Sequence, residues 1–310
     1  MKKVIVVGSL NVDLTVYTPR FPLAGQTVVG RTLKIGMGGK GSNQATAAHR
    51  SGGQVCMVGR MGRDAMADVV RAHYEREGMS RAYITESDTA ETGTASIEVE
   101  DAGQNRIVIV KGANAELSAA QVEAAQAEFA AAGVVLTQLE TGWEPIEAAC
   151  RLARQNGIPF VLNPAPYQPI PAQLLQKVDW LTPNETEAAE LTGLPVTNGQ
   201  QAAAAAAAIR RMGVKNVLIT LGSQGVYAVW QGGEELLPPP AVKAVDTTGA
   251  GDAFNGAFAV ALAESRPVPE ALRFASCCAS LSVTRAGAAA SMPWRQEILA
   301  LLEEAYGCKN

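Results

Sequence analysis

Short apolar runs of strand length alternate along the chain with longer amphipathic segments rich in alanine. The runs are KVIVVGS (3–9), QVCMVGRMG (54–62), GVVLTQLE (133–140), IPFVLNPAP (158–166), VDWLTPNE (178–185) and KNVLITLGS (215–223). Nearly continuous apolar runs are typical of strands that are buried on both faces of a parallel sheet. The segment after Ser118 and the alanine tract 202–208 have the composition of helices. The pattern predicts an α/β fold, with a central, mostly parallel sheet and helices on both faces.

Two stretches, 12–33 and 92–111, do not follow this alternation. Both are rich in β-formers and Gly or Pro turns, and EDAGQNR (100–106) has the composition of a hairpin tip. We expect them to pair as a small β lid over the ends of the parallel strands, where open α/β sheets bind ligands. The α/β domain then comprises 1–11, 34–91 and 112–310. The alternative is a pair of simple edge hairpins.

Composition narrows the class of partner. The chain has 310 residues, is 47% hydrophobic and 18% charged, and carries a net charge of -4, which is ordinary for a globular protein. A chain with this negative net charge shows no basic stripe that could bind nucleic acid. No apolar run in the sequence is long enough to span a membrane. The first apolar run breaks at Gly8, too early for a signal peptide. Five scattered cysteines favour free thiols in the cytoplasm over disulfides. We therefore expect a small-molecule partner.

The stretch VDTTGAGDAFNGAF (245–258) places Asp252 directly behind a Gly-Ala-Gly turn that enters a helix. The amides of Gly249, Ala250 and Gly251 would lack intrahelical acceptors there and would form an anion hole. A carboxylate beside such a hole can accept the proton of a hydroxyl that attacks a phosphoryl group. The alternative is that Asp252 caps the helix.

A second glycine-rich stretch, GMGGKG (36–41), formally matches the dinucleotide-binding pattern G-x-G-x-x-G. That fingerprint should join the first strand to its helix, whereas this strand ends near Ser9. A phosphate loop would need Ser or Thr in place of Gly41 and Gly in place of Lys34. The glycines instead allow a small polar ligand to approach the backbone, with Lys40 and Asn43 beside it.

The two glycine-rich stretches, GGKGSNQA and DTTGAGDAFNG, occur in the order typical of the ribokinase-like carbohydrate kinases, the PfkB family. NPAP, TPNETE and TLGSQG lie between them as in that family, and the resemblance extends from GSLNVDL to SVTRAGAAASMPW. Within the family the chain is most similar to the members that phosphorylate ribose. The resemblance implies transfer of the γ-phosphoryl group of ATP to a primary hydroxyl of a sugar, D-ribose giving ribose 5-phosphate. The alternatives are deoxyribose, another pentose or a ketohexose.

The resemblance also implies roles for individual residues. Asp252 would be the catalytic base, assisted by the amides of Gly249, Ala250 and Gly251. The sugar would be bound by Asn11, Asp13, Gly39, Lys40, Asn43, Glu140 and Asp252. ATP would be bound by Asn184, Thr220, Gly222, Ser223, Gly225 and Gly251, and Glu187 would hold Mg²⁺ through water. Without the family, Asp13 and Glu140 could be solvated strand ends, and the favoured interpretation of Asn184 and Glu187 is an exposed helix start capped by Asn184.

The loop VDTTG could direct successive carbonyl oxygens toward one point on the side away from the phosphates. This region of the chain resembles a K⁺ site of the family. The resemblance implies that K⁺ activates the enzyme. The implied ligands, mainly backbone oxygens, are Asp246, Thr248, Ser282, Arg285, Gly287 and Ser291. The alternative is that Asp246 ends a strand and caps the turn.

Two other classes compete with a kinase. The hypothesis of a nicotinamide-dependent dehydrogenase rests on the G-x-G-x-x-G match, and such an enzyme would bind NAD. A sugar- or nucleotide-binding regulator would keep the fold without the chemistry. The lid could also pair edge to edge, which would give a homodimer.

Overall fold

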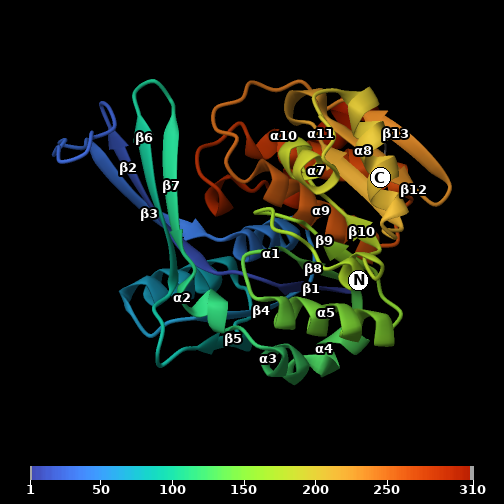
Figure 1. The fold of residues 1–310 in the computed structure, drawn as a ribbon, viewed down its shortest axis with the longest axis horizontal. Helices are drawn as coiled ribbons and strands as arrows, with labels where there is room; N and C mark the ends of the chain where they lie inside the picture. Colours follow the sequence, from blue (N-terminus) through green and yellow to red (C-terminus); the bar gives the residue numbers. More distant parts are fainter. Residues whose placement is uncertain (1, 308–310) are drawn as a thin grey trace.

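The computed structural model describes residues 2–307 and contains two separate sheets (Figure 1). The larger sheet has nine strands in the order β13-β12-β11-β10-β9-β8-β1-β4-β5. Its strands are β1 (Lys3–Val7), β4 (Val55–Met61), β5 (Tyr83–Glu86), β8 (Ala132–Thr137), β9 (Phe160–Leu162), β10 (Trp180–Leu181), β11 (Asn216–Thr220), β12 (Val226–Trp230) and β13 (Gly233–Leu237). The pairs from β5 to β11 are parallel, and the edge pairs β11–β12 and β12–β13 are antiparallel. The predicted mostly parallel sheet is confirmed.

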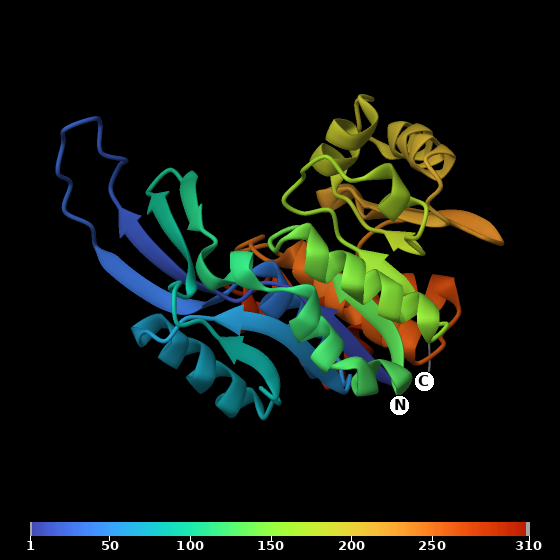
Figure 2. The same ribbon diagram turned by 60° about the horizontal axis from the view of Figure 1, so that its bottom comes forward.

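Helices cover both faces of this sheet, as predicted (Figures 1 and 2). Along β1, Val4 and Val6 pack into one core while Ile5 and Val7 pack into the other, because successive strand side chains point to opposite faces. The first core is formed with α1 (Lys40–Arg50), α2 (Ala65–Glu77), α9 (Ala250–Ala263), α10 (Val268–Ser282) and α11 (Arg295–Tyr306). The second is formed with α3 (Ala119–Ala124), α4 (Gln126–Ala130), α5 (Trp143–Gln155), α6 (Ala172–Leu175), α7 (Glu185–Thr192) and α8 (Gly199–Arg211).

The two stretches that departed from the alternation form a second sheet of four strands, in the order β3-β2-β6-β7. They are β2 (Asn11–Thr18), β3 (Thr32–Gly38), β6 (Gly93–Glu100) and β7 (Asn105–Val110). This sheet, which we call the β lid, projects from one side of the α/β body (Figures 1 and 2). The expected hairpin tip is present, since the Gly103 N–H donates to Glu100 O between β6 and β7. The stretches are therefore joined in one sheet, and β3 continues past position 33 to Gly38.

Two details of the fold differ from the sequence pattern. The helix expected after Ser118 is present and begins with a capping box of Ser118 and Gln121, but it is interrupted at Ala125, where α3 ends and α4 begins. No Gly or Pro marks that break. The hairpin of β12 and β13 was not predicted, although VYAVW is a run of β-formers and Gly232 and Gly233 follow it closely.

The packing of α1 against α9 depends on Gly256. A Cβ at Gly256 would lie 2.5 Å from the backbone oxygen of Gln44 and 2.6 Å from Ala47 Cβ. Glycine therefore allows the two helices to approach closely, and their N-terminal turns meet beyond the carboxyl ends of the parallel strands. Within residues 2–307, no helix has both the length and the apolar character needed to cross a bilayer.

Candidate active site

The buried carboxylate of Asp252 lies in the first turn of α9 and is directed toward α1. Asn43 Nδ2 donates to Oδ2 and Gln44 Nε2 donates to Oδ1, each at 2.9 Å. The N-cap of α9 is Gly249, and that helix start has no side-chain cap. The carboxylate is thus held by neighbouring amides rather than serving as the cap of its own helix. Asn43 Oδ1 is buried without a hydrogen-bond partner in the described part of the chain, so it can accept from a ligand hydroxyl.

The turn that opens α9 is shaped by Gly249, whose φ of 78° lies in the left-handed region that favours glycine. The N–H of Ala250 donates to Thr247 O at 3.2 Å. Thr247 precedes the helix, so this acceptor is not an intrahelical one, but it occupies an amide that was expected to line the anion hole. A Cβ at Gly251 would meet no atom within 4 Å. The backbone at Gly251 borders open space, whereas the Ala250 amide would have to exchange its acceptor to bind an anion.

Glu140 connects the end of the β8 segment to the start of α1. Its Oε2 accepts from the Lys40 N–H at 2.9 Å and from the Ser9 hydroxyl, which in turn accepts from the Gly41 N–H at 3.2 Å. Glu140 is 7% exposed, so it is not a solvated strand end. These bonds fix the carboxylate against the glycine-rich turn.

Asn11 and Asp13 lie on β2, opposite the end of β3. A Cβ at Gly38 would lie 2.1 Å from Asp13 Oδ1, and one at Gly39 would lie 2.6 Å from the Asn11 nitrogen. The glycines of this turn therefore allow the end of β3 to lie close beside β2 and to lead into α1. Asn11 Oδ1 accepts from Asn114 Nδ2 at 2.8 Å, so the amide group of Asn11 has a fixed orientation.

Four carboxylates and one lysine influence one another in this region. Burial, together with Glu140 and Asp252, raises the pKa of Asp13 to about 7. Burial would lower the pKa of Lys40, but Asp252, Glu140 and Glu187 outweigh it and raise that pKa, so the ammonium stays charged. Perturbed carboxyl groups around a partly buried cation are typical of binding and catalytic sites. The expected sugar-side residues are thus brought together at one place.

Asn184 and Glu187 form a capping box at the start of α7. The Glu187 N–H donates to Asn184 Oδ1 and the Asn184 N–H donates to Glu187 Oε2, both at 2.9 Å. Asn184 therefore caps α7, which is the alternative role that the sequence suggested for it. Asn184 also forms a parallel bridge with Thr220, which joins two of the residues expected to bind ATP. Burial raises the pKa of Glu187, against the opposing effects of the Asn184 N–H and Lys40.

The other expected ATP residues lie in the turn after β11. Gly222 and Ser223 are exposed. Gly225 has φ 96°, and a Cβ there would lie 2.0 Å from Leu237 O. The Gly225 carbonyl accepts from the Leu221 N–H at 2.8 Å. Gly225 is therefore required by the turn itself, while Gly222 and Ser223 present an open surface.

A divalent metal at this site would need oxygen ligands from the substrate. Within residues 2–307, no group of three or more His, Cys, Asp and Glu side chains could hold a metal ion. One carboxylate oxygen of Glu187 is bonded in the capping box, which leaves the other for a metal-bound water. A single carboxylate with waters and phosphates is a donor set that suits Mg²⁺.

The loop around Asp246 packs against the segment that follows α10. Asp246 Oδ1 accepts from the Thr248 N–H at 2.9 Å and Oδ2 accepts from the Gly287 N–H at 2.8 Å. Burial would raise the pKa of Asp246, but these bonds outweigh it and hold the pKa below its usual value. The side chain of Arg285 pairs with Glu297. The hydroxyls of Ser282 and Ser291 donate to Ala279 O and Ala288 O. The two segments expected to hold K⁺ are therefore adjacent, and Asp246 also has the turn-capping role.

Sequence reasoning gave no role to Gln44, which contacts Asp252 directly. It also missed the buried side chains that continue from Gln44 beneath the site. They are Gln138, Asn163, Thr182 and Asn255. The available signal was a polar residue in an otherwise apolar or small-residue context, as in GSNQA, NPAP and DAFNG. Their partners lie far away in the sequence, so the pattern alone could not connect them.

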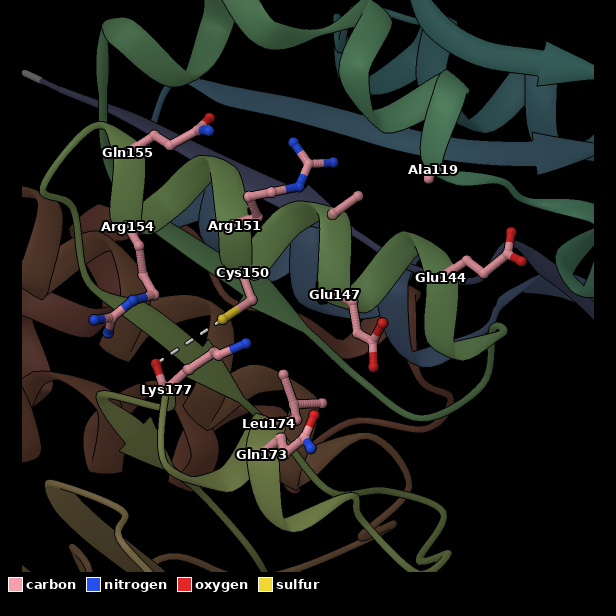
Figure 3. Close-up of a pocket in the computed structure, with 11 residues that line it drawn as sticks. Ala119, Glu144, Glu147, Cys150, Arg151, Arg154, Gln155, Gln173, Leu174 and Lys177 are labelled. Atoms are coloured by element: carbon pink, nitrogen blue, oxygen red, sulfur yellow. Dashed lines mark hydrogen bonds between the residues drawn. The ribbon is translucent and has the colours of Figure 1, made fainter.

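A cavity of about 540 Å³ lies away from this site, beside α5 (Figure 3). Its polar lining includes Glu147, Arg151, Arg154 and Lys177, all of which are exposed. Cys150 Sγ donates to Lys177 O at 3.9 Å at its edge. The cavity contains none of the residues that surround Asp252. We therefore place the chemistry at the meeting point of α1 and α9.

Comparison with known proteins agrees with this arrangement. The model of the pfkB family carbohydrate kinases matches residues 1–295. The chain belongs to the PfkB family of carbohydrate kinases. A ribokinase of Haemophilus influenzae is 40% identical over 304 residues, which cover 98% of this chain and 99% of that protein. A deoxyribokinase of Salmonella typhi is 36% identical over 291 residues, or 94% and 95% of the two chains.

Among solved structures, this PfkB chain resembles Arabidopsis thaliana ribokinase complexed with ribose and ATP. The TM-score is 0.90 at 37% identity, and the match covers 97% of this chain and 99% of the other. The ribokinase-like fold is therefore confirmed, as is the assignment to the carbohydrate kinases. This family membership removes the dehydrogenase alternative, which rested on a glycine pattern now explained by the contact between the β3–α1 turn and β2.

Proposed function

We propose that this carbohydrate kinase transfers the γ-phosphoryl group of ATP to the primary hydroxyl of D-ribose, giving ribose 5-phosphate. The observation that carries the proposal is the Asp252 carboxylate, held by Asn43 and Gln44 beside the open turn at Gly251. The ribokinase relative and the similar structure with ribose and ATP support the choice of sugar. A pocket that binds another sugar would need only small changes of side chains.

Asp252 acts as the general base. Its two oxygens have amide donors, so the carboxylate is fixed where it can accept the proton of the attacking hydroxyl. The turn at 249–251 receives the phosphoryl group, and its backbone N–H groups stabilise the charge that develops in the transition state. Lys40 remains protonated among the carboxylates and balances part of their charge. The reaction thus needs positioning and electrostatic stabilisation rather than covalent catalysis by the protein.

Asn184 and Glu187 bind the phosphate end of ATP together with Mg²⁺. Glu187 is the carboxylate that would hold a metal-bound water, and Asn184 fixes its orientation through the capping box. When bound, Mg²⁺ neutralises charge on the phosphates. Thr220, Gly222 and Ser223 line the nucleotide side.

The sugar is bound by the groups around the glycine-rich turn, and its hydroxyls pair with carboxylates and amides. Asn43 Oδ1 supplies a buried acceptor with no partner among the described residues. A site with such groups discriminates against an analogue that lacks a hydroxyl, because the group is then left buried and unpaired. We therefore expect 2-deoxyribose to be the poorer substrate, although a deoxyribokinase is among the relatives. The remaining sugar ligands are Asn11, Asp13, Gly39, Lys40 and Glu140.

K⁺ binds between the loop of Asp246 and the segment 282–291, and fixes the shape of the turn at 249–251. The bonds from Asp246 to Thr248 and Gly287 support this proposal, because they hold the two segments against each other.

The β lid closes over the sugar and forms a homodimer through its apolar surface. Leu33 and Ile35 on β3 and Ile107 to Val110 on β7 are exposed by 47 to 67%. These are the two edge strands of the lid, and exposed apolar edges favour pairing.

We also propose a cytoplasmic location, in keeping with the buried thiols of Cys56, Cys150 and Cys278, while Cys308 lies outside the described residues.

An ADP-release assay with MgATP and a panel of sugars tests this function. D-ribose should have the highest kcat/KM, followed by 2-deoxyribose, other pentoses and ketohexoses. A clear preference for the deoxy sugar or a hexose would assign the chain to a sister activity. An absence of turnover with every sugar would favour a binding protein that has lost the chemistry.

A further inference from the structure

A continuous chain of buried hydrogen bonds runs beneath the proposed base. Gln138 Nε2 donates to Gln44 Oε1 at 2.6 Å, and Gln44 Nε2 donates to Asn163 Oδ1 at 3.0 Å. Asn163 Nδ2 donates to the backbone oxygen of Thr182 at 2.8 Å, and the Thr182 hydroxyl donates to Asn255 Oδ1 at 2.6 Å. We call these five residues the polar chain. Each is at most 6% exposed, so water does not compete for these bonds.

The polar chain joins the ends of three neighbouring strands to the first turns of α9. Gln138 follows β8, Asn163 follows β9 and Thr182 follows β10. At the far end, Asn255 Nδ2 donates to Gly251 O at 2.8 Å, inside the turn that precedes Asp252. The sheet is therefore connected by side chains to both the base and the backbone next to it.

Gln44 is the branch point, and its amide orientation is determined by its neighbours. Its nitrogen donates to two acceptors, Asp252 Oδ1 and Asn163 Oδ1, and its oxygen accepts from Gln138. A flipped amide would place its oxygen against two acceptor oxygens, and each would lose its donor. Because the side chain is 0% exposed, Gln44 has no other partner to which it could turn.

The two donors to Asp252 differ in what else they do. The carbonyl oxygen of Asn43 has no partner within residues 2–307, and Asn43 is expected to contact the sugar, so its hydrogen bonds change when substrate binds. In Gln44, by contrast, both the amide nitrogen and the amide oxygen are hydrogen-bonded to other protein side chains. One oxygen of Asp252 is therefore held by a fixed group, while the other faces a group that responds to the ligand.

We propose that Gln44 is a positioning residue for the phosphoryl-transfer step. It holds Oδ1 of Asp252 in place and thereby directs Oδ2 toward the attacking hydroxyl. The inference rests on the proposed function, in which Asp252 is the base. Removing a group that acts through the catalytic base in this way should destabilise the transition state more than it weakens substrate binding, so kcat should change more than KM.

The test is a double-mutant cycle with Gln44→Met and Asp252→Asn. Gln44→Met keeps the length of the side chain but removes its donors. It should lower kcat by about 10- to 100-fold and change the KM values for sugar and ATP by less than about threefold. In the Asp252→Asn background it should lower kcat by less than about twofold, because a residue that acts through the carboxylate has no effect once the carboxylate is gone.

Thr46→Val is the matched control. Thr46 is a buried polar residue two positions further along α1, and its hydroxyl contacts Ser42 O and His73 rather than Asp252. Its kcat should stay within about threefold of wild type even where its unfolding temperature falls. Equal losses of kcat in Gln44→Met and Thr46→Val would overturn the proposal, and so would a loss that multiplies in the double variant. Near-normal turnover of Asp252→Asn by itself would instead refute the proposed base.

Gln44→Glu keeps the test decisive if Gln44→Met does not fold. Its carboxyl group has the size of the amide and can donate to Asp252 only when it is protonated. The kcat of this variant relative to wild type should therefore rise as the pH is lowered from 9 to 6. A ratio that does not change with pH would contradict the positioning role.

Discussion

Asn43 Nδ2 donates to Asp252 Oδ2 at 2.9 Å, a contact between residues 209 positions apart in the sequence. It joins the two glycine-rich stretches, one at the start of α1 and the other at the start of α9. The residue expected to contact the sugar is therefore bonded to the residue expected to remove its proton.

Asn43→Ala should raise the KM for the sugar by about 10- to 100-fold, because it removes the buried Oδ1 acceptor and the donor to Asp252 together. The KM for ATP should be nearly unchanged. Steady-state kinetics with each substrate varied in turn measure both values. Asn156→Ala, at the exposed end of α5, is the control. A larger effect on ATP than on the sugar would show that Asn43 lies on the nucleotide side.

Gly256→Ala should separate α1 from α9, since the new methyl group would lie 2.5 Å from the Gln44 backbone oxygen. We expect a loss of about 1–3 kcal/mol in the free energy of unfolding and a fall in kcat of at least about tenfold. Denaturant unfolding and kinetics check the two effects. Gly142→Ala is a suitable control, because its nearest contact would be at 3.8 Å. Full activity of Gly256→Ala would mean that close approach of the helices is not needed.

How much of this arrangement the sequence predicts depends on how local each signal is. The apolar run of β1, the two stretches of the β lid and the start of a helix after Ser118 are properties of neighbouring residues, and all were predicted correctly. The break at Ala125 was not, because no residue there disfavours a helix.

The candidate site was predictable where a residue type itself suggests chemistry. Asp252 and Lys40 stood out because charged groups lay beside glycine turns, whereas Glu140 was indicated only by the family resemblance. Gln44 and Asn163 did not stand out, since a neutral amide gains its role from partners that only the fold brings together. The amide of Ala250 was expected to line an anion hole, and its bond to Thr247 O, in the turn before the helix, was not predicted.

Asp13→Asn should stabilise the protein at high pH and impair sugar binding. Burial beside two carboxylates raises the pKa of Asp13 from 3.8 to about 7 in the folded state. The contribution of this group to stability is fully present below the unfolded value and is lost as the pH rises through 7. The variant should therefore melt roughly 2–5 °C above wild type at pH 8.5 and level with it at pH 4.

Thermal unfolding across this pH range measures the Asp13 effect, with the exposed Asp68→Asn as control. A stability difference that is constant with pH would contradict the assignment. A variant that is less stable than wild type at pH 8.5 would do so as well, because it would mean that the ionised carboxylate stabilises the fold.

K⁺ should raise kcat or lower KM well above the level in Na⁺ at matched ionic strength, and Asp246→Ala should lose the difference. The physical reason is that Asp246 holds the loop 245–248 against Gly287. Initial rates in K⁺, Na⁺ and a large organic cation measure the effect, with the exposed Asp101→Ala as control. Equal rates in all three cations would leave Asp246 with its turn-capping role alone.

The turnover of Asp252→Asn with MgATP and D-ribose tests the central claim most directly. This substitution preserves the shape of the side chain and removes the base. We expect kcat to fall by about 10² to 10⁴ while the unfolding temperature and ATP binding, measured by calorimetry, stay close to wild type. Turnover within a few-fold of wild type in a folded variant that binds ATP would contradict the assignment of Asp252 as the base.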